Sequence, residues 1–65
     1  MKYDLVGQDG NAFSLMGYTQ RAMKEAGFTI MEINEVLKDA MSSDYNNLLV
    51  TLDKAIQECN QRRVK

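Results

Sequence analysis

Side chains that could act as acids, bases or nucleophiles are few in this sequence, and their positions favour structure over catalysis. The chain has no histidine, so proton transfer would fall to carboxylates, lysines or tyrosines. Its single cysteine, Cys59, would need a nearby base or positive charge to become a nucleophile. Cys59 instead belongs to the apolar stripe of a predicted helix, where a buried thiol is expected. The sequence therefore predicts a protein that is not an enzyme and has no catalytic residues.

Three acidic residues, Glu32, Glu35 and Asp39, recur at about the spacing of a helical turn and could be imagined as metal ligands. The same spacing is typical of the solvated face of a helix. Zinc usually takes several cysteine or histidine ligands, which this chain lacks. We expect no bound metal and no cofactor.

A second candidate for chemistry is the stretch GQDGN, in which Gly7 and Gly10 bracket Gln8 and Asp9. It is superficially similar to the Gly-x-x-Gly loop of KH domains, which clamps single-stranded nucleic acid. Such loops carry basic residues and follow a helix, and this one does neither. A phosphate-binding loop would need Gly-Lys-Ser/Thr, which is absent. We expect Gly7, Asp9 and Gly10 to turn the backbone, and Asn11 to cap the helix that follows.

Residues 20–37 have the outline of a helix-turn-helix, with two predicted helices joined at Gly27. The run AGFTIMEINEVL also looks like a segment of MerR-type regulators. A recognition helix usually offers Arg, Lys, Asn or Gln to phosphates and base edges. This one would offer Glu32, Glu35 and Asp39, so nucleic acid is not the expected partner. A small DNA-binding regulator remains an alternative.

The charge distribution is uneven although the net charge is only −1. From residue 29 to residue 58 the chain has six acidic residues and two lysines. The tail then carries Arg62, Arg63 and Lys65, which complement the dipole at the end of a helix. An acidic body argues against the clustered basic surface of a nucleic-acid-binding protein.

Length and composition predict one small domain over residues 1–65. The chain is 45% hydrophobic and has no proline, yet 65 residues lie near the lower limit for a self-supporting core. Domains of this size often gain stability by oligomerising. The lone cysteine suits a reducing compartment, and no window resembles a signal peptide or a membrane span. We expect a cytoplasmic protein that does not enter a membrane.

These residues are positioned by a mainly α fold, a short strand followed by a three-helix bundle. The alternation in KYDLV predicts the strand, at residues 2–6, and helices are predicted at about 12–26, 30–41 and 44–60. The expected helix boundaries are Gly27 as a C-cap, Thr29 as an N-cap with Glu32 three residues later, and Ser43 or Asp44 before the third helix.

Each predicted helix has an apolar stripe that should face the core. Gly17 is expected to let the strand at 2–6 approach the first helix closely. The stripes comprise Phe13, Met16, Gln20 and Met23, flanked by Leu15, Thr19, Ala22 and Ala26, then Ile30, Ile33, Leu37, Ala40 and Met41, and finally Tyr45, Leu48, Leu49, Leu52, Ile56 and Cys59.

A single strand has no partner within this chain, which favours pairing with another protein or with a second copy in a homodimer. Aromatic side chains are common at such interfaces. We therefore predict a partner-binding patch formed by Tyr3, Leu5, Tyr18 and Phe28.

Over residues 3–56 the chain resembles a group of small uncharacterised proteins from bacterial and phage genomes, commonly from prophage regions. The similarity lies in DLVGQDGNAF, MGYTQRAMKEAG and SSDYNNLL. It implies a phage-associated accessory protein in the host cytoplasm, and no catalytic residue or cofactor. The function expected is a non-enzymatic protein that binds a host or phage protein and modulates host machinery or defence. The alternatives are a structural component of a phage assembly and the DNA-binding regulator.

Overall fold

The described part of the chain folds into three helices that pack side by side. The computed structural model describes residues 3–5 and 10–63. The helices are α1 (Ala12–Ala26), α2 (Ile30–Ala40) and α3 (Tyr45–Arg63). The predicted three helices are therefore confirmed, with α2 ending one residue earlier and α3 continuing to Arg63. None of the described helices is long and apolar enough to cross a membrane.

Cap residues fix both ends of α1 and the start of α2. Asn11 begins α1, because its side chain accepts a hydrogen bond from the Phe13 N–H at 2.8 Å. Gly27 ends α1 with a φ of 98°, a left-handed conformation that favours glycine. Thr29 and Glu32 then form a reciprocal capping box at the start of α2.

The start of α3 is capped by Asp44, one of the two residues predicted for this role. The Asp44 side chain accepts a hydrogen bond from the Asn47 N–H at 2.9 Å, and its carbonyl accepts from the Leu48 N–H. The Tyr45 hydroxyl donates to the Gly10 carbonyl, which ties the start of α3 to the start of α1. The predicted turn residues Gly7 and Asp9 lie outside the described residues.

Helix α3 forms the centre of the core, because it packs against both α1 and α2, whereas α1 and α2 contact each other less. Its buried residues divide between two apolar clusters, with Leu48 and Leu52 in one and Ala55, Ile56 and Cys59 in the other. The first cluster comprises Tyr3, Ala22, Met23, Ile33, Ala55, Ile56 and Cys59, and the second comprises Leu15, Met16, Ala40, Leu48 and Leu52.

Four residues assigned to apolar stripes are instead exposed: Phe13, Ile30, Met41 and Tyr45. They lie in the first turn of a helix or, for Met41, just after the end of α2. Gln20 is exposed as well, because α1 turns its Leu15, Thr19 and Ala22 face toward the core. The buried Thr19 hydroxyl is satisfied by the Leu15 carbonyl at 2.9 Å.

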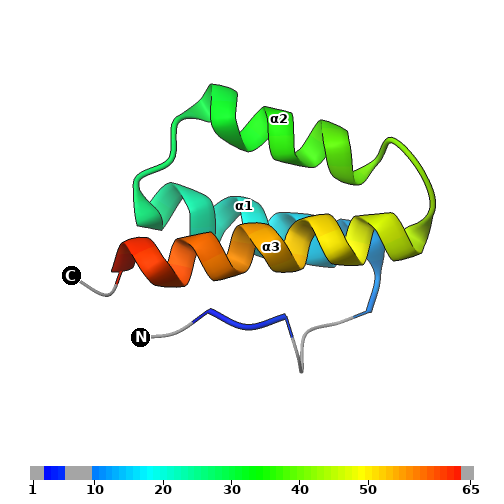
Figure 1. The fold of residues 1–65 in the computed structure, drawn as a ribbon, viewed down its shortest axis with the longest axis horizontal. Helices are drawn as coiled ribbons and strands as arrows, with labels where there is room; N and C mark the ends of the chain where they lie inside the picture. Colours follow the sequence, from blue (N-terminus) through cyan, green and yellow to red (C-terminus); the bar gives the residue numbers. More distant parts are fainter. Residues whose placement is uncertain (1–2, 6–9, 64–65) are drawn as a thin grey trace.

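Residues 3–5 form no strand, contrary to the prediction for residues 2–6, of which 2 and 6 lie outside the described residues. Side chains bind their backbone groups instead of another strand. The Tyr3 N–H and carbonyl bond with the Asn60 side chain, and the Asp4 N–H donates to the Tyr18 hydroxyl. Figure 1 shows this segment on the opposite side of α3 from α2.

Gly17 does not provide a close approach either. A side chain at Gly17 would meet nothing within 4 Å, so no other segment of the described chain packs against that position.

Candidate protein-binding surfaces

The predicted partner-binding patch is used mainly for packing within the chain. Tyr3 is only 7% exposed, so little of its side chain is accessible to a partner. Leu5, Tyr18 and Phe28 are partly buried against the same apolar cluster as Tyr3. The rings of Tyr3 and Tyr18 meet edge to face, with centroids 6.5 Å apart. The structure therefore brings the four residues together, but beside the core.

Phe28 is further covered by the end of α3. The Arg62 guanidinium lies 3.8 Å from the centroid of the Phe28 ring, a cation–π contact. The same guanidinium lies 3.9 Å from a Glu32 carboxylate oxygen. The hydrogen bond from the Thr29 N–H, aided by the Thr29 hydroxyl and by Arg62, holds the pKa of Glu32 below its ordinary value. Phe28 and its neighbours thus join α2 to α3.

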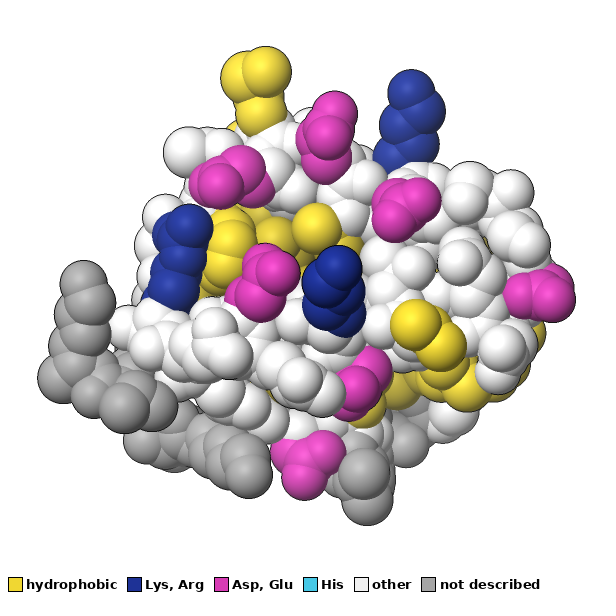
Figure 2. Space-filling view, in the orientation of Figure 1, with side chains coloured by type: hydrophobic (Ala, Val, Ile, Leu, Met, Phe, Trp, Pro, Cys, Tyr) yellow, Lys and Arg dark blue, Asp and Glu magenta, His cyan; other side chains and the backbone are white. Residues whose placement is uncertain are grey.

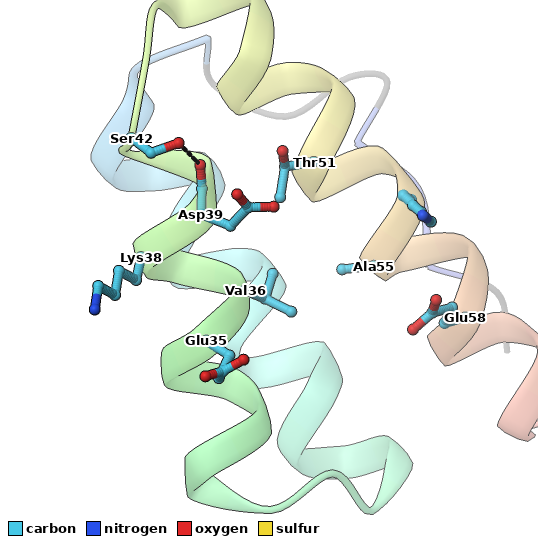
Figure 3. Close-up of a pocket in the computed structure, with 9 residues that line it drawn as sticks. Glu35, Val36, Lys38, Asp39, Ser42, Thr51, Ala55 and Glu58 are labelled. Carbon is cyan, nitrogen blue, oxygen red and sulfur yellow. Dashed lines mark hydrogen bonds between the residues drawn. The ribbon is translucent and has the colours of Figure 1, made fainter.

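An open groove with a volume of about 510 Å³ lies between α2 and α3, and we call it the α2–α3 groove. Figure 3 shows Val36 of α2 and Ala55 of α3 pointing toward one another between the two helices. These two small apolar side chains form the floor of the groove. The groove is lined by Glu35, Val36, Lys38, Asp39, Ser42, Thr51, Lys54, Ala55 and Glu58.

The rim of the α2–α3 groove is charged. Three carboxylates, from Glu35, Asp39 and Glu58, outnumber the two lysines, and Lys38 points away from the opening (Figure 3). In the space-filling view, hydrophobic side chains are visible at the bottom of the hollow between α2 and α3, surrounded by charged side chains (Figure 2). The groove therefore combines an apolar floor with a mainly acidic rim.

Hydroxyl groups are a minor part of the groove lining. Its only hydroxyl groups come from Ser42, which donates to the Asp39 carbonyl at 2.6 Å, and Thr51. Across residues 3–5 and 10–63, no three His, Cys, Asp or Glu side chains are grouped so that they could hold a metal ion. Cys59 is a buried free thiol, as predicted, and burial raises its pKa, so the thiol stays protonated at neutral pH.

Three exposed apolar side chains lie at one end of the bundle, where α1 starts, α2 ends and α3 starts (Figure 1). Phe13 is 80% exposed in the first turn of α1, Met41 is exposed after α2, and Tyr45 is partly exposed at the start of α3. This end therefore presents exposed apolar surface.

Two features of these surfaces could not be found by reading the sequence. The acids Glu35 and Asp39 were visible as one face of a helix, but nothing showed that Glu58 of α3 would face them. Asn60 gave no signal at all, since a single asparagine near a helix end has no recognisable pattern.

Comparison of the chain with known protein families, with curated proteins and with solved structures gave no match. The resemblance to prophage proteins therefore stays a prediction, and the function has to be inferred from the chain's own residues.

Proposed function

We propose that this chain is a non-enzymatic interaction protein whose α2–α3 groove binds a basic, amphipathic segment of a partner protein. The observation that supports the proposal is the apolar floor of Val36 and Ala55 beneath the carboxylates of Glu35, Asp39 and Glu58. A partner helix or extended segment with one apolar and one basic face matches both features.

The two parts of the groove contribute differently to binding. Burial of apolar surface on the small floor residues supplies favourable free energy, at about 25 cal/mol per Å². Lysine and arginine side chains of a partner can lay their aliphatic stems on this floor and keep their charges at the rim. Each exposed ion pair adds little free energy. The acidic rim mainly selects a basic partner and speeds its approach.

The acidic face of α2 supports a protein partner over DNA. Glu32, Glu35 and Asp39 are all exposed on the helix that would read DNA in a helix-turn-helix. Carboxylates repel the phosphate backbone, which dominates the affinity of DNA-binding proteins. The groove also argues for an intermolecular role, because nothing in the described chain covers it.

The biological setting is also a proposal. The sequence resemblance suggests a phage or prophage protein that acts in the cytoplasm of a bacterial host, where the partner would be a host or phage protein. Binding at the groove could block or redirect that protein without any chemical reaction.

The experiment is affinity capture from a bacterial lysate with the tagged chain and two charge variants. Glu58→Lys reverses a charge in the groove, and Asp53→Lys makes the same change on α3 outside it. We expect one protein to be retained by the wild-type chain and by Asp53→Lys, and to be lost with Glu58→Lys. A captured protein that Glu58→Lys retains equally well would show that the groove is not the binding site.

A further inference from the structure

The exposed side of α1 is itself a basic amphipathic segment. Gly17, Arg21 and Lys24 are exposed and recur at intervals of four and three residues, so they share one side of the helix. The buried residues of α1 lie on the opposite side, against the core. Phe13, one turn before Gly17, is 80% exposed. We call these four residues the α1 outer face, which joins two positive charges to an exposed apolar side chain.

The two cations of the α1 outer face are available to a partner. Among the described residues, neither Arg21 nor Lys24 forms an ion pair. The other charged residue of α1 is Glu25, whose carboxylate accepts a hydrogen bond from the Tyr3 hydroxyl at 2.8 Å. The α1 outer face therefore has a positive charge of its own, and it complements the carboxylates of Glu35, Asp39 and Glu58 in the α2–α3 groove.

The shapes of the two surfaces also match. A side chain at Gly17 would meet nothing within 4 Å in its own described chain, although glycine is unfavourable inside a helix. The absence of a side chain there leaves the backbone of α1 open to close approach by another molecule. The floor of the groove is formed by the small side chains of Val36 and Ala55. The aliphatic stems of Arg21 and Lys24 can cover this floor while their charges stay at the rim.

The α1 outer face and the groove lie on different sides of the bundle. The hollow between α2 and α3 is visible in Figure 2, and in the same orientation Figure 1 shows α1 behind α3. One copy can therefore offer its α1 to a neighbour while its own groove stays open.

We propose that the α2–α3 groove binds the α1 outer face of a second copy of this chain, so that copies associate head to tail. The inference rests on the proposed function, because it names the partner of the same groove. Each pair of copies leaves one groove and one α1 outer face free. Association therefore continues to larger open chains or rings instead of stopping at a two-fold dimer.

The test is sedimentation velocity of the full-length chain over a range of concentrations. We expect the wild-type chain to exceed the size of a dimer as its concentration rises, and added salt to reverse this growth. Glu58→Lys and Arg21→Glu should each weaken association several-fold. The chain that carries both changes should regain it, because the reversed charges are again complementary. Asp53→Lys, on α3 outside the groove, is the matched control and should associate like the wild-type chain.

A steric variant tests the same contact without changing a charge. Gly17→Gln places a side chain in open space on its own chain, so the fold should be kept while association weakens. A wild-type chain that stays monomeric, growth that stops at a dimer, or a double variant that does not recover would overturn the proposal. Adding a helical peptide with one lysine face and one leucine face to the monomeric chain then separates two failures. Binding of the peptide would overturn only self-association, whereas no binding would overturn the proposed function as well.

Discussion

The apolar surface of α3 is covered by the chain's own residues on one side and is open on the other. On the side facing residues 3–5, the Tyr3 side chain covers the core. Hydrogen bonds of Tyr3 to Asn60 and Glu25 hold it in place. On the side facing α2, Val36 and Ala55 lie at the bottom of an open groove. The same helix thus carries one site already filled by its own chain and one that is open. The difference indicates that an apolar surface beside α3 can be covered by a short segment with very few residues.

The largest effect should come from a core residue of α3. Leu52 is fully buried at the centre of α3, and Leu52→Ala should reduce the free energy of unfolding by about 2–5 kcal/mol. Val50→Ala on the same helix removes an exposed side chain and should change it by about 0.5 kcal/mol or less. Chemical denaturation of both variants measures the contrast. Equal losses would mean that the core face of α3 is misassigned.

The covered side can be opened selectively. Asn60→Ala removes the amide that satisfies two backbone groups of Tyr3 and should cost about 1–3 kcal/mol. Asn46→Ala is the matched control, because it makes the same change at an exposed position of α3. Urea titration of both should show the larger loss for Asn60→Ala. A negligible loss of stability in Asn60→Ala would show that the contacts of residues 3–5 contribute little to the stability of the fold.

Helix α2, which lines one side of the α2–α3 groove, is stabilised by its N-terminal cap. Thr29→Ala removes the acceptor for the Glu32 N–H and should destabilise the chain by about 1 kcal/mol. Thr29→Ser keeps a hydroxyl in the same place and should restore most of the loss. Thermal unfolding followed by circular dichroism measures both. A serine variant as unstable as the alanine variant would contradict the capping explanation.

The smallest effect is the pH dependence that Glu32 contributes. Its pKa in the folded chain lies below the ordinary value of 4.5, so the charged carboxylate favours the folded state. This contribution is complete above pH 4.5 and is lost as the pH falls through the lower folded-state pKa. We expect the stability difference between the wild-type chain and Glu32→Gln to shrink as the solution is acidified. A difference that stays constant in acid would contradict the assignment.

The fold was largely predictable because local sequence patterns determine its helix boundaries. Asn11, Gly27 and Thr29 act through backbone groups within a few residues, so their roles follow from their neighbours in sequence. The orientation of each helix about its axis was less predictable. Phe13 matched the apolar periodicity of α1 and is still 80% exposed, because α1 presents a neighbouring face to α3.

The surfaces were the least predictable part of the molecule. Residues 3–5 have the alternation of a strand, yet Asn60 binds the backbone groups that a strand would offer to a neighbour. That contact joins opposite ends of the chain, and no local pattern encodes it. The α2–α3 groove likewise depends on which faces of two helices come together.

We propose that the open side of α3 binds a basic amphipathic segment. The most direct measurement is a titration of the isotope-labelled chain with a synthetic helical peptide that has lysines on one face and leucines on the other, followed by NMR. We predict saturable chemical-shift changes at the amides of Val36 and Ala55 and none at residues 3–5. The affinity of the peptide should fall as salt is added. Shifts confined to the end formed by Phe13, Met41 and Tyr45, or no saturable shifts, would contradict the account.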